Sequence, residues 1–172
     1  MIVTGGSRGI GAAIARLAGR RGYDVCVNYT KSKDQAEQVV RDIEASGQRA
    51  VAVLGDIGNE TELTSLYEFV DRELSPLTAL VNNAAIDYET AIADFETDGL
   101  RRVYAVNVFA PFIAAREAGL MKAVVSVELP GFARGSCLRR DTGVIAWLQT
   151  AAAALEIYRL LRPSSYPRRI RG

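Results

Sequence analysis

The chain has 172 residues, of which 49% are hydrophobic and 24% are charged, and its formal net charge is +1. These values are typical of a single domain that buries its own core. The apolar runs fall short of the roughly 20 residues that a bilayer requires, and no basic-then-apolar leader precedes Thr4, so we expect a cytoplasmic protein without membrane contact. The absence of histidine and the presence of two cysteines exclude histidine-dependent triads and argue against a disulfide framework or a metal site.

The first part of the chain alternates apolar runs with amphipathic segments. Ile2–Val3 begins a strand that runs into a glycine-rich turn, and a helical pattern then continues to Gly22. Further strands are predicted at residues 24–29, 49–57 and 78–84, and helices at residues 32–47 and 59–74. Asn59, followed three residues later by Glu62, is typical of a helix N-cap. Apolar strands separated by helices predict an α/β fold, a Rossmann-type doubly wound parallel sheet covered on both faces.

A long helix is predicted over residues 94–119, with a buried stripe that includes Leu100, Tyr104 and Val106. The apolar pattern then weakens, and only residues 143–162 resume a strand-like and then a helix-like rhythm. Residues 1–122 carry 13 basic and 17 acidic side chains, whereas residues 123–172 carry 8 and 3, and all eight of these late cations are arginine. The character of the sequence therefore changes near residues 118–122.

Three glycines mark the first turn as a candidate phosphate site. Gly5, Gly9 and Gly11 form a G-x-x-x-G-x-G arrangement between a predicted strand and a predicted helix. Residues without a Cβ allow a tight turn, so that backbone N–H groups and a helix N-terminus approach a pyrophosphate. In this context the motif favours a dinucleotide site over a purely structural turn.

Four short motifs stand in order along residues 1–117. Thr4 to Gly11 (TGGSRGIG) opens the chain, Asp56-Ile57 and Asn82-Asn83-Ala84 follow two later strands, and Asn107 lies in the long helix. Together they resemble the motifs of the short-chain dehydrogenase/reductase family. The resemblance implies that Asp56 and Ile57 contact the adenine ring of the cofactor. It also implies that Asn107 belongs to a catalytic tetrad, and that Ala85, where the family has glycine, crowds the nicotinamide ribose. It further implies a cofactor site formed by Gly5, Gly6, Ser7, Arg8, Gly9, Ile10, Gly11, Asn28, Asp56, Ile57, Asn83 and Ala84.

The residues after the second strand bear on the choice of cofactor. A carboxylate about 20 residues past the glycines would bind the ribose 2′-hydroxyl of NAD, but residues 28–30 contain none. Arg8, Lys31 and Lys33 instead supply positive charge for a 2′-phosphate. We therefore predict that NADP(H) is preferred over NAD(H). The alternative is that Lys31 and Lys33 form only the solvated start of a helix.

The catalytic tyrosine and lysine of the family are not found after Asn107. A phenol has a pKa of about 10, so it needs a neighbouring cation to transfer protons near neutral pH. No lysine follows Lys122, and the nearest match is Tyr158 with Arg162; the family's serine would fall at Ile145. We interpret Tyr158 and Arg162 as part of an ordinary amphipathic helix.

We therefore predict an NAD(P)-binding Rossmann domain at residues 1–117 and a divergent part of the same domain at residues 118–172. Because such domains commonly reach roughly 250 residues, we hypothesise a truncated or frame-shifted chain whose tail is out of frame. The resemblance implies an oxidoreductase that transfers hydride between NADP(H) and a carbonyl or alcohol, and a homo-oligomer for an intact member. The alternative is a non-catalytic nucleotide-binding remnant that lacks the tyrosine–lysine pair. The scattered late arginines do not predict nucleic-acid binding.

Overall fold

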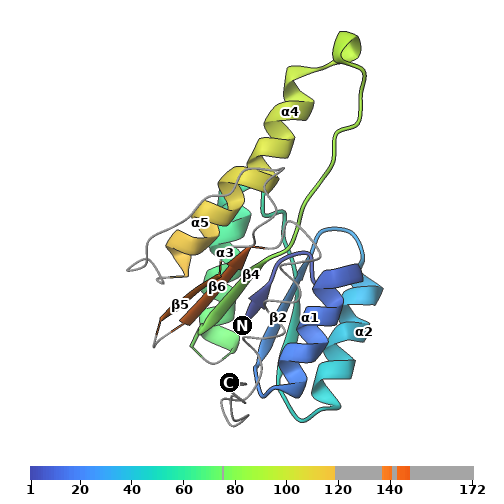
Figure 1. The fold of residues 1–172 in the computed structure, drawn as a ribbon. Helices are drawn as coiled ribbons and strands as arrows, with labels where there is room; N and C mark the ends of the chain where they lie inside the picture. The colour runs from blue at the N-terminus through green and yellow to red at the C-terminus, as the bar shows by residue number, and fades with distance from the viewer. Residues whose placement is uncertain (75, 119–136, 141–142, 148–172) are drawn as a thin grey trace, which may run out of the picture.

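A computed structural model describes residues 1–74, 76–118, 137–140 and 143–147 (Figure 1). In these residues one sheet has the strand order β3-β2-β1-β4-β6-β5. The strands are β1 (Ile2–Val3), β2 (Val25–Tyr29), β3 (Ala50–Leu54), β4 (Ala79–Asn82), β5 (Cys137–Arg140) and β6 (Gly143–Trp147). All neighbouring strands pair in parallel except β5, which is antiparallel to β6. The predicted Rossmann-type parallel sheet is confirmed.

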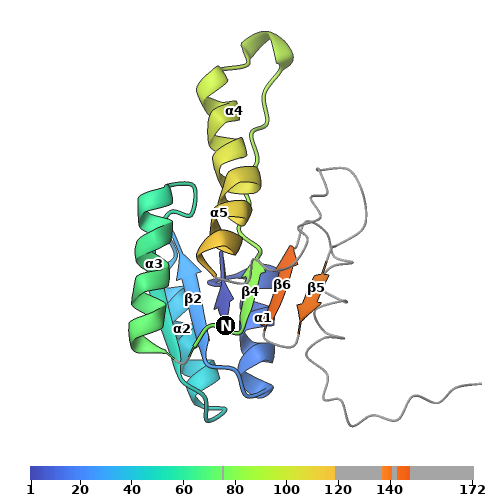
Figure 2. The ribbon, with the colours of Figure 1, turned by 90° about the vertical axis from the view of Figure 1, so that its left-hand side faces the viewer.

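Helices cover both faces of the sheet (Figure 2). They are α1 (Gly9–Arg20), α2 (Lys33–Glu44), α3 (Glu60–Glu73), α4 (Thr97–Tyr104) and α5 (Ala110–Glu117), with a 3-10 turn η1 (Ile92–Asp94) before α4. Successive strand residues face opposite sides, so Val3 joins the core beneath α1 and α2, whereas Ile2 joins the core beneath α3 and α5. The continuous apolar strands of the sequence therefore supply both cores.

The loop before α3 is fixed by the predicted N-cap. The side-chain oxygen of Asn59 accepts hydrogen bonds from the backbone N–H of Thr61 at 3.0 Å and of Glu62 at 3.4 Å. The Glu62 carboxylate accepts from the Asn59 amide at 3.0 Å and from the backbone N–H of Asp56 at 2.8 Å. These bonds hold the loop in which Asp56 lies.

The long helix predicted over residues 94–119 is interrupted, which corrects the sequence-based boundaries. A π-helical turn η2 (Ala105–Phe109) separates α4 from α5. Leu100 and Tyr104, which were expected to be buried, are 40% and 47% exposed, while Val106 is buried as predicted. The reason is visible in Figures 1 and 2, where α4 extends beyond the sheet and so has no strand beneath it.

The segment predicted to be divergent contributes β5 and β6 to the sheet. The strand-like pattern after residue 143 corresponds to β6, in which Ile145 pairs with Leu80 of β4. The helix-like continuation to residue 162 lies outside the described residues. Within the described ranges, no helix has the length and apolar character needed to cross a membrane.

Candidate functional site

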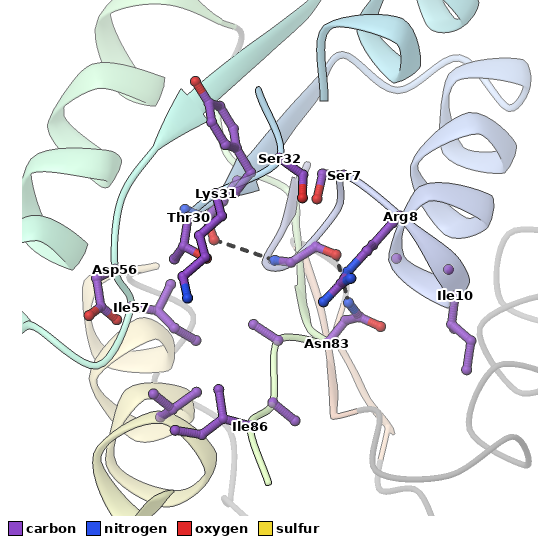
Figure 3. A pocket seen from close by; sticks show the side chains of 18 of the residues that line it. Ser7, Arg8, Ile10, Thr30, Lys31, Ser32, Asp56, Ile57, Asn83 and Ile86 are labelled. Atoms are coloured by element: carbon purple, nitrogen blue, oxygen red, sulfur yellow. Dashed lines mark hydrogen bonds between the residues drawn. The ribbon is translucent and has the colours of Figure 1, made fainter. Parts of the chain in front are cut away.

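A cleft of about 830 Å³ opens where β1, β2, β3 and β4 end (Figure 3). Ligands of open α/β sheets bind at the carboxyl ends of the strands, in sites of roughly 300–1,000 Å³. The lining comes from the loops after these four strands, from α4 and from η2. It consists of Gly5, Ser7, Arg8, Gly9, Ile10, Gly11, Asn28, Tyr29, Thr30, Lys31, Ser32, Asp56, Ile57, Asn83, Ala84, Ala85, Ile86, Arg102 and Val106.

The glycine-rich turn brings the N-terminus of α1 to this cleft. Gly5 and Gly9 have φ values of +61° and +56°, in the left-handed region that favours glycine. A Cβ at Gly11 would overlap the carbonyl oxygen of Gly5, whereas a Cβ at Gly9 would meet no atom within 4 Å. Arg8, at the N-cap position, makes no side-chain capping bond, and the first turn contains no acidic residue. The N-terminal N–H groups therefore remain available to an anionic ligand.

Thr4 and Asn83 join the glycine-rich turn to the end of β4. The buried Thr4 hydroxyl oxygen accepts from the backbone N–H of Asn83 at 3.0 Å and of Ala84 at 3.1 Å. The Asn83 side-chain amide donates to the carbonyls of Thr4 at 2.9 Å and Gly5 at 3.1 Å. Two walls of the cleft are thus held together by four hydrogen bonds.

Asn28 lines the cleft and also connects its neighbouring loops. Its buried amide donates to the carbonyl of Gly55 at 2.9 Å, and its side-chain oxygen accepts from the N–H of Gly5 at 3.4 Å. Gly6 does not line the cleft. Its N–H donates to the Asn28 carbonyl at 2.9 Å, and a Cβ there would lie 3.1 Å from Val27. Gly6 therefore packs against β2 and does not face the cleft, unlike the other glycines of the turn.

Two positively charged side chains that line the cleft are not neutralised by an acidic partner among the described residues. They are Arg8 and Lys31, and within the part of the chain that the structure describes neither forms an ion pair. The hydroxyl groups of Ser7 and Ser32 lie close by in Figure 3. Lys33, also expected to add charge, is instead 3.6 Å from Glu37 on α2 and does not line the cleft. The arrangement suits a phosphate group.

Around the loop after β3 the cleft combines an apolar wall with a carboxylate. Ile57 is buried and Asp56 is partly exposed, and both line the cleft beside Arg102 and Val106. Sequence reasoning did not identify the last two, nor Ser32 and Ile86. The four-residue spacing of Arg102 and Val106 does place them on one helical face. Only the packing of that face against the loop after β3 brings them to the cleft.

Asn107 lies in the π-helical turn and does not line the cleft. Its side-chain oxygen accepts from the Ile86 N–H at 3.0 Å, and its amide donates to the Ile86 carbonyl at 2.9 Å. Ile86 does line the cleft, next to Ala85. Asn107 therefore acts on the cleft by fixing the backbone of the loop after β4, and π-helical turns are frequent at functional sites.

The sequence contains further candidates for catalysis and metal binding. Tyr158 and Arg162 lie outside the described residues. The Tyr-x-x-x-Lys spacing does occur once in the sequence, at Tyr29 and Lys33, but Lys33 pairs with Glu37 on α2. Groups of side chains that could hold a metal ion are absent from the residues described. Cys26 is a buried free cysteine, and burial raises the pKa of its thiol to about 12.

Comparisons with known sequences place this site among related proteins. Residues 1–124 match the family model for the short chain dehydrogenases. The chain is 37% identical over 118 residues to the uncharacterized oxidoreductase YgfF of Escherichia coli, and 38% identical over 117 residues to versicolorin reductase stcU of Emericella nidulans. Both matches cover 68% of this chain, but 48% and 44% of the respective relative. The chain thus spans about half the length of the curated relatives it matches.

Solved structures give the same result. A short chain dehydrogenase from Burkholderia cenocepacia, in complex with NADP, matches with a TM-score of 0.67 and 39% identity, over 69% of this chain and 49% of the other. A blue fluorescent protein from a metagenomic library, in complex with NADPH, matches with a TM-score of 0.66 and 37% identity, over 70% and 49%. Both proteins hold a nicotinamide dinucleotide phosphate.

Proposed function

This chain belongs to the short chain dehydrogenase family, and on that premise we propose that it binds NADP(H) and transfers hydride to or from the carbonyl or alcohol group of a small molecule. One observation carries the proposal. A single cleft at the carboxyl ends of β1 to β4 combines a helix N-terminus with no capping side chain, two cations without an ion-pair partner among the described residues, and an apolar wall. The similar structures with NADP and NADPH support this ligand class.

The lining residues fit the parts of such a dinucleotide. The N-terminus of α1, at Gly9 and Ile10, is suited to the pyrophosphate, because its N–H groups and dipole favour an anion. The apolar side chain of Ile57 is suited to the base. The loop at residues 83–86 is left for the nicotinamide riboside. We propose that these positions, all within residues 1–117, form the cofactor-binding part of the chain.

The two cations that line the cleft support a preference for NADP(H) over NAD(H). A 2′-phosphate is the only difference between the two ligands, and Arg8 and Lys31 line the cleft without an ion-pair partner among the described residues. The carboxylate that would bind a free 2′-hydroxyl is absent from residues 28–30. Ser7 and Ser32 add hydroxyl donors to the lining.

The chemistry supplied by the bound nicotinamide is hydride transfer. The contribution that we assign to Asn107 is positional, because its amide does not ionise near neutral pH and both its polar atoms already bind Ile86. It fixes the loop at residues 84–86, against which the reacting end of the cofactor would lie. A misplacement of about 1 Å in such a loop can cost on the order of 10²-fold in rate.

The proposal is tested by calorimetric titration of the full chain with NADPH and NADH, followed by an absorbance assay of NADPH oxidation with a panel of ketones and quinones. We expect NADPH to bind at least several-fold more tightly than NADH. Oxidation of NADPH with any carbonyl compound of the panel would support hydride transfer by this chain. Failure of both nucleotides to bind would refute the proposal. Binding without turnover across the panel would favour the non-catalytic nucleotide-binding remnant.

A further inference from the structure

We propose that Arg102 of α4 is a positioning residue for the base of the dinucleotide. It holds the Asp56 carboxylate at the wall of the cleft, so that this carboxylate accepts a hydrogen bond from an amino group on the base. The inference rests on the proposed function, because it takes the ligand of the cleft to be a dinucleotide. It adds a residue from a helix that lies more than forty positions beyond Asp56 in the sequence.

The Asp56 carboxylate is held from two sides. One oxygen accepts from the Arg102 guanidinium at 2.5 Å, and the other accepts from the backbone N–H of Gly58 at 2.9 Å. The backbone N–H of Asp56 in turn donates to Glu62 at 2.8 Å. Its orientation is therefore set by α4 and by its own loop together, and not by the loop alone.

Lone pairs remain on the carboxylate for a ligand. An ionised carboxylate has about four acceptor positions, and Arg102 and Gly58 each use one. An ionised carboxylate only accepts hydrogen bonds, so it favours a donor in the cleft and disfavours a carbonyl or a phosphate. The phosphates are better placed at the N-terminus of α1, which leaves the base for the end formed by Asp56 and Ile57. An amino-bearing base is consequently the best match, in agreement with the adenine contact that the family resemblance implies for Asp56.

The ion pair itself contributes little to folding. Its side chains are 42% and 32% exposed, and exposed ion pairs are weak because water screens them. The local structure nevertheless makes room for it. A Cβ at Gly58 would overlap the Arg102 guanidinium and lie 2.8 Å from Val106. The absence of a side chain at Gly58 is thus what lets Arg102 reach Asp56.

The neighbouring arginine provides a matched control. Arg101 is on the same helix and carries the same charge, but it pairs with Asp98 at 2.8 Å and does not line the cleft. Removing Arg101 changes the net charge and the helix as much as removing Arg102 does. Only Arg102 contacts the carboxylate at the cleft.

The experiment compares NADPH with its analogue in which hypoxanthine replaces adenine, so that a carbonyl stands in place of the amino group. Dissociation constants are measured by calorimetry for the full chain. We expect the parent to bind NADPH about tenfold more tightly than the analogue, as for a hydrogen bond to a charged acceptor. In Arg102→Met the ratio should fall below about threefold, whereas in Arg101→Met it should match the parent. Gly58→Ala, which displaces Arg102 without removing charge, should lower the ratio as well.

The outcomes separate this inference from the proposed function. An unchanged ratio in Arg102→Met would refute the role of Arg102 while leaving the cofactor assignment intact. Equal binding of the two ligands by the parent would do the same. If the parent binds neither ligand, the proposed function fails and the inference fails with it. Because each ratio is measured on one protein preparation, a partly unfolded variant does not imitate the predicted loss.

Discussion

Asn107 binds both backbone polar groups of Ile86, accepting from its N–H at 3.0 Å and donating to its carbonyl at 2.9 Å. The two residues are 21 positions apart in the chain. One lies in the π-helical turn between α4 and α5, and the other lies in the wall of the cleft. This contact joins the long helical segment to the loop after β4.

Replacing Asn107 by alanine should therefore loosen the cleft as well as the fold. We expect a loss of about 1–2 kcal/mol in the free energy of unfolding, because two partly buried backbone groups lose their partner. Asn107→Asp retains an acceptor for the Ile86 N–H but no donor for its carbonyl, so an intermediate loss is expected. Urea unfolding measures both losses of stability. The affinity for NADPH, measured by titration, should fall in the same order, least for Asn107→Asp and most for Asn107→Ala. Equal stability in all three proteins would contradict this role.

The glycine turn yields a test with an internal control. Gly9→Asp should abolish NADPH binding, because a negative side chain would project into the space beside the N-terminus of α1. Gly22 also has a positive φ, +88°, and open space around a Cβ, but it does not line the cleft. Gly22→Asp therefore imposes a similar backbone cost without the charge at the cleft. Calorimetry should show parental affinity for Gly22→Asp, and equal affinities for both variants would show that the turn is only structural.

The two lysines after β2 allow a comparison between a cation that lines the cleft, Lys31, and a nearby cation that does not, Lys33. Lys31→Ala and Arg8→Ala should each narrow the preference for NADPH over NADH, because both cations line the cleft. Lys33→Ala should leave that preference unchanged, since Lys33 is paired with Glu37. The readout is the ratio of the two dissociation constants, which cancels general effects on folding. Equal affinities for NADPH and NADH in the parent would refute the assigned preference.

The parts of this molecule that local sequence determines were predictable. The strands, the glycine-rich turn and the Asn59 cap each depend on residues within a few positions of one another, and the parallel sheet follows from their alternation with helices. The site residues at the strand ends were implied by the family resemblance, and the parallel sheet brings them to one edge. Family resemblance added the roles expected for Asp56 and Asn107.

What could not be predicted depends on contacts between distant elements. The periodicity around Leu100 and Tyr104 correctly identifies a helix, but it does not reveal that α4 extends beyond the sheet and leaves both side chains exposed. Likewise, nothing near Arg102 in the sequence indicates that it meets Asp56, 46 positions earlier.

The buried thiol of Cys26 gives a prediction about alkaline stability. Burial in β2 raises its pKa from the ordinary value of 9.0 to about 12. Between these two values the unfolded chain releases the proton while the folded chain keeps it, so rising pH favours unfolding. Cys26 should thus lower the free energy of unfolding by about 1.4 kcal/mol for each pH unit in this window, and should have no such effect below it.

The contribution of Cys26 is isolated by comparing the parent with Cys26→Ala in urea unfolding at several pH values between 8.0 and 11. The variant loses a buried sulfur and is expected to be less stable at every pH, but its stability should fall less steeply above pH 9.0. Tyr67, which donates a buried hydrogen bond to the Ala114 carbonyl at 2.7 Å and whose pKa is also raised by burial, keeps some alkaline slope in both proteins. The difference between the two slopes therefore reports Cys26 alone. Parallel curves would mean that the thiol is ionised as readily in the folded chain as in the unfolded one.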